Sequence, residues 1–417
     1  MTTGALHNLA LPPAVLMLED GTMFLGASTG AAGEACGEIS FNTVMIGYPE
    51  VISDPANAGQ IVTMTYPQIG NYGIATVDLE SSRPTVRALV VRDICPTPSN
   101  YRSDSSLPDF LAAAGIVAIT EVDTRSLIRH LRTRGTMKAI VSTLESDPQA
   151  LLARLNAAPR ISEENLVATV STEAAYLYKM SDEHVKWHGP APLPRFKVVA
   201  VDLGVTRSTL DLLCRLGCAV IVVPWNTPAQ EILSYAPDGV LLSSGPGDPR
   251  VLNAAIKTAG DLMGKVPLMA VGLGHLVLAI AAGATVGRLR TGHHGGNYPV
   301  INLVDESVSI TSQSHGFALR FESLGQAQAA AGRSLIAAND TCGRIQLTEI
   351  NLNDNTVEAL RYLDIEAFSV QYHPEVAPGP ISAATAYDGF LAAMQAAGER
   401  VRATGQTSSQ ESEADNA

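Results

Sequence analysis

Apolar runs and amphipathic segments alternate regularly in the second half of the chain. Runs such as VVAV (198–201) and VIVV (220–223) have the continuous apolarity of strands buried on both faces. Four strands are expected at 196–204, 219–225, 239–249 and 266–272, with helices between them at 208–217, 229–236 and 254–264. This alternation predicts an α/β domain built on a doubly wound, mostly parallel sheet with helices on both faces.

The first half has a less regular pattern. AVLMLEDGTMFLG (14–26) predicts a hairpin that turns at Asp20-Gly21. Buried strands are expected at 60–66 and 86–94. VAITEVDTRSLIRHLRTRG (117–135) predicts a strand and then a helix that begins near Asp123-Thr124 and ends at Gly135. These elements indicate a mixed β/α domain.

Changes in composition divide the chain. The segment MSDEHVKWHGPAPLPR ends in closely spaced prolines, which are excluded from helix interiors and central strands, so a linker is expected there. The last residues are polar and predict a disordered tail. The expected parts are an extension at 1–13, a first domain at 14–170, a linker at 171–195, a second domain at 196–397 and the tail at 398–417.

A sharp strand-to-helix turn follows the run PLMAV in PLMAVGLGHLVLAIAAGA (267–284). Many α/β enzymes hold their nucleophile on such an elbow. Here Gly272 stands at the apex and has no side chain that could attack a substrate. The loop SSGPGDP (243–249) offers close backbone approach at Gly245 and Gly247. Both features follow strands, so both are expected at the edge of the sheet where active sites of this class lie.

FSVQYHPEVAPGP (368–380) places His373 two residues before Glu375, after a predicted strand. A histidine backed by a carboxylate is the base and orienter of a catalytic triad. Another segment, SITSQSHGFAL (309–319), is expected to be a strand that ends in a polar turn.

Composition narrows the functional classes. The net charge of −13 argues against nucleic-acid binding, which requires a basic face. No apolar run is long enough for a membrane span, and the N-terminus lacks the basic region of a signal peptide. Five scattered cysteines indicate a reduced, cytoplasmic protein without a disulfide framework. Cys214 and Cys218 have no neighbouring ligands and are not expected to bind metal.

Together these motifs resemble the small subunit of carbamoyl phosphate synthetase, whose second domain is a class I, triad-type glutamine amidotransferase. The resemblance rests on GEISFNTVMIGYPEVISDPANAGQIVTMTYPQIGNYGI and EVDTRSLIRHLRTRGTMKAIV in the first half, and on LLSSGPGDP, GLGHLVLAIAAGA, GHHGGNYPV, SHGFAL and SVQYHPEVAPGP in the second. It implies glutamine hydrolysis and transfer of ammonia to a large subunit, which makes carbamoyl phosphate for arginine and pyrimidine synthesis. ATP and magnesium would belong to that subunit, so no cofactor is expected in this chain. A higher oligomer of heterodimers is possible.

The chain departs from the family pattern at several positions. The family has Cys-Leu-Gly-His-Gln where this chain has Gly272-Leu273-Gly274-His275-Leu276, so the nucleophile and a glutamine are replaced. A serine and an asparagine of the family become Val44 and Ser314, and a Gly-Ala-Lys-Arg-Asn segment becomes GVTRST, with Thr206 and Ser208. The resemblance implies a glutamine pocket and triad that retain Gly245, Gly247, Leu273, Gly316, Phe317, His373 and Glu375.

Three hypotheses follow. The favoured one is a small subunit without glutaminase activity that still serves as structural partner of the large subunit, because glycine cannot form the acyl-enzyme. A second is a glutaminase that uses a replacement nucleophile. Ser243 and Ser244 lie near the loop and His275 lies in the turn, whereas Cys214 and Cys218 are expected on a helix away from that edge. A third is a non-enzymatic metabolite-binding or regulatory module on the same fold. No metal site is expected, since His293 and His294 are adjacent and family members share them without a metal.

Overall fold

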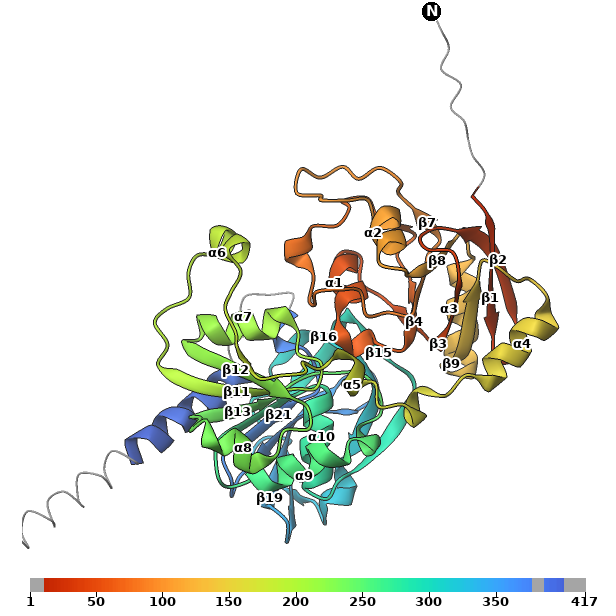
Figure 1. The fold of residues 1–417 in the computed structure, drawn as a ribbon. Helices are drawn as coiled ribbons and strands as arrows, with labels where there is room; N and C mark the ends of the chain where they lie inside the picture. The colour runs from red at the N-terminus through yellow and green to blue at the C-terminus, as the bar shows by residue number, and fades with distance from the viewer. Residues whose placement is uncertain (1–10, 377–385, 401–417) are drawn as a thin grey trace, which may run out of the picture. The chain divides into compact units, whose positions relative to one another are not determined.

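The computed structural model describes residues 11–376 and 386–400 and forms two compact units. The units divide between Ile161 and Ser162, nine residues before the predicted end of the first domain. Helix α5 (Val167–Val170) therefore belongs to the second unit. Figure 1 shows the elements of both units. Within the described ranges, no helix has the length and apolarity needed to cross a membrane.

The first unit is built on a closed barrel with the strand order β1-β2-β8-β6-β4-β3-β9. Its interior is filled by buried apolar side chains such as Leu16, Ile39, Ile61 and Ile119. The strands are β1 (Pro13–Leu18), β2 (Met23–Ser28), β3 (Glu34–Asn42), β4 (Gln60–Met64), β6 (Ala88–Val90), β8 (Val117–Thr120) and β9 (Met137–Ser142). The predicted hairpin is present as β1 and β2, but barrel closure was not predicted.

Helices and short strands lie around this barrel. The predicted helix α3 (Thr124–Arg134) is capped by Asp123, whose carboxylate accepts from the Ser126 N–H at 3.0 Å, and it ends at Gly135. The remaining elements are α1 (Tyr48–Ser53), η1 (Pro55–Asn57), β5 (Gln68–Ile69), η2 (Thr76–Asp78), β7 (Asp93–Ile94), α2 (Leu107–Ala113) and α4 (Pro148–Ala157).

The second unit contains a 12-stranded sheet whose main order is β10-β12-β11-β13-β14-β21-β20-β19-β15-β16. Its parallel half comprises β12 (Cys218–Pro224), β11 (Phe196–Asp202), β13 (Gly239–Leu242), β14 (Leu268–Val271) and β21 (Ala367–Val370). The other strands pair antiparallel: β10 (Tyr176–Leu177), β15 (Thr285–Asn302), β16 (Val308–Arg320), β17 (Gln328–Ala329), β18 (Leu335–Asn339), β19 (Gly343–Asn351) and β20 (Val357–Tyr362).

Helices cover both faces of the parallel half, as predicted. On one face, α8 (Ala229–Ser234), α9 (Asn253–Leu262) and α10 (Leu273–Ala281) pack on alternate strand residues such as Val199 and Leu242. On the other face lie α7 (Arg207–Arg215) and the helix at 386–400, which contributes Phe390. The short helices of the unit are α6 (Asp182–His188), η4 (Pro249–Val251), η5 (Phe321–Leu324) and η6 (Pro374–Val376), and η3 (Ile161–Glu163) spans the division between the units.

Three local predictions are corrected. The expected linker at 171–195 contains α6 and the edge strand β10, which pairs antiparallel with β12. The polar turn expected at the end of the strand in 309–319 is absent, because β16 continues to Arg320 in pairing with β15. Residues 398–400 are helical rather than part of a disordered tail, and the rest of that predicted tail lies outside the described residues.

Candidate functional site

The strand-to-helix elbow is present and centres on Gly272. Strand β14 ends at Val271, Gly272 has φ 56° and ψ −113°, and α10 begins at Leu273. The Gly272 N–H donates to the Val370 carbonyl of β21 at 2.9 Å, which links the apex to the neighbouring parallel strand. Backbone with positive φ is strained for residues that carry a Cβ, and elbows that hold a nucleophile keep such strain at the reacting residue. The geometry of a nucleophile elbow is therefore preserved around a residue without a side chain.

Close packing of α10 on β13 fixes the position of the elbow. A Cβ at Gly274 would lie 2.2 Å from the Leu242 carbonyl oxygen, so only glycine allows this approach. The Gly274 N–H donates to the Ser243 carbonyl at 3.0 Å. A Cβ at Gly245 would lie 2.0 Å from the Leu203 carbonyl oxygen and 3.0 Å from the Leu273 side chain. The Gly245 loop and the start of α10 are thus in contact, as the sequence predicted from their shared sheet edge.

Gly247 has a separate role in the same loop. It adopts φ 86°, a value that favours glycine, and the space beside it is filled by Leu166 of the second unit, 3.6 Å from a Cβ at that position. The following Asp248 accepts a hydrogen bond from the Arg250 N–H at 2.9 Å. The loop is therefore held in one conformation by packing and by its own hydrogen bonds.

His373 and Glu375, predicted as a base and its orienter, are in direct contact. The His373 Nδ1 lies 3.0 Å from the Glu375 Oε1, and both side chains are almost fully buried. Burial acts to raise the pKa of Glu375, but attraction to His373 and the hydrogen bonds to the carboxylate outweigh it and lower that pKa. The backbone N–H of His373 donates to the Ser312 carbonyl of β16 at 2.9 Å, which anchors the histidine after β21.

Thr206 supports this pair, a role that the sequence did not indicate. Its hydroxyl donates to the Glu375 Oε1 at 3.1 Å and also lies 2.7 Å from the Thr209 hydroxyl. Thr206 is the N-cap of α7, and its side chain accepts from the Thr209 N–H. A residue expected only as a departure from the family pattern is thus a neighbour of the triad carboxylate.

The remaining predicted pocket residues of the second unit fall into two groups. Leu273, Leu276 and Phe317 are buried members of one apolar cluster. Ser314 and Gly316 lie on β16, where Ser314 pairs in register with His294 of β15. A Cβ at Gly316 would have no atom within 4 Å, so this position faces open space. Leu276 packs into the core, where a glutamine side chain would require hydrogen-bond partners.

Val44 belongs to the first unit. It is half-buried against the apolar cluster that contains Tyr48, and its N–H donates to the Asn42 side chain at 3.0 Å. Its assignment to the glutamine pocket stays a prediction.

The candidate replacement nucleophiles differ in their surroundings. Ser243 is engaged, because its hydroxyl donates to the Ser244 carbonyl and accepts from the Leu203 N–H. Burial raises the pKa of Cys214 to about 11 and that of Cys218 to about 12, which disfavours the reactive thiolate. The Ser244 hydroxyl also donates, to the Gly204 carbonyl at 3.4 Å, but the Ser244 Cβ would lie 3.2 Å from a Cβ at Gly272. Of these four residues, Ser244 is therefore the only one shown to be next to the elbow apex.

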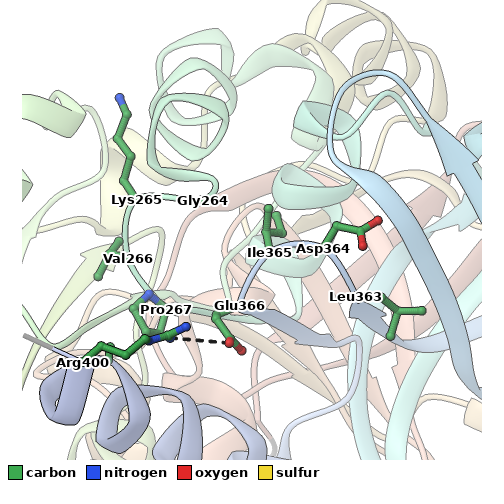
Figure 2. A pocket seen from close by; sticks show the side chains of 10 residues that line it. Gly264, Lys265, Val266, Pro267, Leu363, Asp364, Ile365, Glu366 and Arg400 are labelled. Atoms are coloured by element: carbon green, nitrogen blue, oxygen red, sulfur yellow. Dashed lines mark ion pairs between the residues drawn. The ribbon is translucent and has the colours of Figure 1, made fainter. Parts of the chain in front are cut away.

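A cavity of about 370 Å³ opens at the opposite end of the parallel strands. It is lined by residues that precede β14, such as Lys265 and Pro267, and by residues 363–366, which precede or begin β21. Figure 2 shows Arg400 reaching toward Glu366 across this cavity, at an N···O distance of 3.7 Å. The cavity is separate from the elbow and contains none of the predicted triad or pocket residues.

Comparisons with known proteins agree with both halves of the chain. The family described as carbamoyl-phosphate synthase small chain, CPSase domain, matches residues 16–141, and glutamine amidotransferase class-I matches residues 199–393. The chain is 43% identical to the carbamoyl phosphate synthase small chain of Syntrophotalea carbinolica, over 92% of this chain and 98% of that protein. The protein of the same description from Thermosynechococcus vestitus is 45% identical, over 92% and 97% of the two chains.

Proposed function

Because the chain belongs to the carbamoyl-phosphate synthase small-chain family, we propose that it is the partner of a large subunit and has lost its own glutaminase activity. The observation that carries this proposal is Gly272, which occupies the apex of an intact elbow, while the His373–Glu375 contact is also present. In this proposal the large subunit contributes ATP and magnesium and makes carbamoyl phosphate from free ammonia. The complex acts in the cytoplasm, as a heterodimer or a higher oligomer of heterodimers.

The chemistry of amide hydrolysis supports the loss of activity. A covalent route needs a thiolate or alkoxide that attacks the amide carbon, and His373 has no such group to activate at position 272. The backbone N–H groups of Gly245 and Leu273 remain available to stabilise an oxyanion. In serine proteases, such a hole and substrate binding alone retain only about 10³–10⁴-fold catalysis over water. A subunit that is retained because it binds a partner is expected to keep its fold even when its nucleophile is lost.

The test is carbamoyl phosphate formation by this chain mixed with its cognate large subunit, with either glutamine or ammonium chloride as nitrogen source. We expect a stable complex on size-exclusion chromatography, and ammonium-dependent synthesis faster than that of the large subunit alone. Glutamine should give no synthesis above the rate without a nitrogen source. Glutamine-dependent synthesis would refute the loss of glutaminase activity. Failure to bind the large subunit would refute the partner role.

Ser244 gives the second hypothesis, a replacement nucleophile, one specific observation, because it lies beside the apex. If glutamine supports synthesis, Ser244→Ala should abolish that activity and leave the ammonium-dependent rate unchanged. Activity that persists in Ser244→Ala would exclude this serine. The third hypothesis, a metabolite-binding module, predicts no complex with the large subunit and a ligand-induced rise in melting temperature.

A further inference from the structure

Three neighbouring side chains outside the triad converge inside the second unit. His293 of β15 and His315 of β16 are directly paired residues across these two strands, and Glu358 lies on β20. All three are buried, and one ligand atom from each (a ring nitrogen or a carboxylate oxygen) lies within 4.8 Å of the other two. No sequence pattern indicated this group, because its members are far apart in the chain and the adjacent His294 suggested a different pair.

Both imidazole rings have hydrogen-bond partners outside the cluster. The His315 Nδ1 lies 2.9 Å from the Phe317 carbonyl oxygen, which only accepts, so Nδ1 is the protonated nitrogen. The His293 Nε2 lies 2.9 Å from a carboxylate oxygen of Asp354, so Nε2 is protonated there. The His293 Nδ1 therefore carries a lone pair. The His315 Nε2 lies 3.3 Å from the Gln313 Oε1, so His315 would have to exchange this contact for an ion in order to bind it. Histidines that bind metals are oriented in this way by a carbonyl or a carboxylate.

Glu358 supplies the third acceptor. Its Oε1 lies 3.9 Å from the His293 Nδ1 and accepts a hydrogen bond from the Asn351 amide at 3.2 Å. Its Oε2 is buried and has no hydrogen-bond partner in the part of the chain that the structure describes. Among the residues that the structure describes, no lysine or arginine forms an ion pair with the Glu358 carboxylate. A buried carboxylate must be neutralised, paired with a cation or bound to a metal.

We propose that His293 Nδ1, His315 Nε2 and Glu358 form a binding site for a divalent transition-metal ion of the zinc type. Two imidazoles and one carboxylate form one of the ligand sets that zinc uses, with a fourth position for water. Tetrahedral ligands about 2.1 Å from an ion lie roughly 3.4 Å apart, so the three groups must draw together by about 1 Å. Glu358 has an oxygen with no partner to lose in that movement.

A metal at this site would connect three strands of the sheet. It would join β15, β16 and β20, which otherwise depend on backbone pairing and on the hydrogen bonds of Asn351 and Gln313. Strand β16 also carries Gly316 and Phe317 of the predicted pocket. Because an ion that binds only the folded state stabilises it, metal binding would raise the melting temperature of the second unit.

The test uses the full chain, stripped with a chelator and then titrated with zinc against a chromophoric zinc indicator. We expect one tightly bound ion per chain and a higher melting temperature in its presence. Glu358→Gln, which keeps the shape of the side chain but removes the negative charge, should lose this stoichiometric site. Asp354→Asn, at a more exposed position, should weaken zinc binding by about 10–100-fold, because it removes only the orienting partner of His293.

His130→Gln is the matched control. His130 forms the same kind of contact with an aspartate, 2.7 Å from Asp20, but it lies in the first unit and outside the cluster. Zinc binding should be unchanged in this variant. The proposal is wrong if the wild-type chain binds no zinc tightly, or if Glu358→Gln and Asp354→Asn bind it as the wild type does. In either case the cluster is a network of hydrogen bonds in which Glu358 is neutral.

Discussion

At the elbow apex, Gly272 has no reactive side chain and adopts backbone angles that favour glycine. Gly272 has a positive φ of 56°, where a side chain is strained by about 1–3 kcal/mol. A Cβ there would also lie 3.2 Å from the Ser244 Cβ, a tight contact that requires a small shift. Glycine at this position therefore offers no reactive group and avoids the strain that a residue with a Cβ would carry.

Restoring a side chain at the apex should destabilise the protein. We expect Gly272→Cys and Gly272→Ala each to lower the free energy of unfolding by about 1–3 kcal/mol, measured by urea denaturation. Gly260→Ala is the control, because Gly260 lies in helix α9 with only one contact near a new Cβ. That variant should be stabilised by roughly 0.5–1 kcal/mol. Equal stability of Gly272→Cys and wild type would show that the apex is unstrained.

Glu50 in helix α1 gives the first unit a pH dependence. Burial raises the pKa of its carboxyl from 4.5 to about 7, and one of its oxygens is buried without a hydrogen bond. A raised pKa means that its contribution to stability is present below pH 4.5 and is lost as the pH rises through about 7.

Glu50→Gln should remove this loss of stability at higher pH, because glutamine resembles the neutral form of the Glu50 side chain. The difference in free energy of unfolding between the variant and wild type should grow in favour of the variant, by up to about 3 kcal/mol, as the pH rises from acidic to mildly basic. Urea unfolding of the first unit at several pH values measures this gain. Asp93→Asn, at an exposed acid of the same unit, should show none. A stability difference between Glu50→Gln and wild type that does not vary with pH would contradict this origin.

Single residues of the candidate site were predictable to different degrees. Gly272, His373 and Glu375 lie within short segments, so the elbow and the base–carboxylate pair could be found from spacing alone. The role of Thr206 could not be predicted, because its contact with Glu375 joins positions 169 residues apart. The cluster of His293, His315 and Glu358 was missed for the same reason, since three strands bring it together.

At the scale of elements, the contact between α10 and β13 determines where the elbow lies. Gly274 and Gly245 are the positions where helix and loop approach backbone carbonyl oxygens most closely. Each would place a new Cβ at 2.2 Å or less from such an oxygen. Neither neighbour is a flexible side chain, so the backbone itself would have to move.

Gly274→Ala should therefore destabilise the second unit by about 2–4 kcal/mol, at or above the usual range for overpacking. Gly316→Ala is its matched control on the opposite wall of the predicted site. A Cβ at Gly316 meets nothing within 4 Å and its φ is not in the left-handed region, so this variant should unfold like wild type. Thermal unfolding monitored by circular dichroism compares the two. A Gly274→Ala variant as stable as Gly316→Ala would contradict the close packing.

Elements with a strong hydrophobic period were predicted well, and those held by pairing alone were not. The alternation from β11 to α10 follows from continuous apolar strands and amphipathic helices. Strand β10 has two residues, both exposed, and its pairing with β12 leaves no pattern in the sequence. Strand β16 continues through SQSH because its partner β15 satisfies the backbone, although those residues are polar.

At the scale of the whole molecule, the two units have separate cores. The apolar clusters of the first unit contain residues from Ala14 to Leu155, and those of the second begin at Val167. The barrel of the first unit could not be predicted, since closure requires pairs such as β1 with β9, which are more than a hundred residues apart. Composition and motifs predicted that there are two domains, but packing decides where they divide.

The position of that division can be tested with fragments. Leu166 and Val167 lie between the predicted boundary and the observed one, and both are almost completely buried. Val167 belongs to the core of the second unit, and Leu166 packs beside Gly247. Burial of two such side chains stabilises the folded state by about 2–5 kcal/mol. A fragment of residues 162–417 should therefore be more stable than one of residues 171–417.

We expect the shorter of these fragments to melt roughly 5–15 °C lower in circular dichroism. The complementary fragments, 1–161 and 1–170, provide the control. The extra nine residues of the longer one carry side chains that pack in the other unit, so both should melt at the same temperature. If the longer first-unit fragment were instead the more stable, and removal of residues 162–170 left the second unit unchanged, α5 would belong to the first unit.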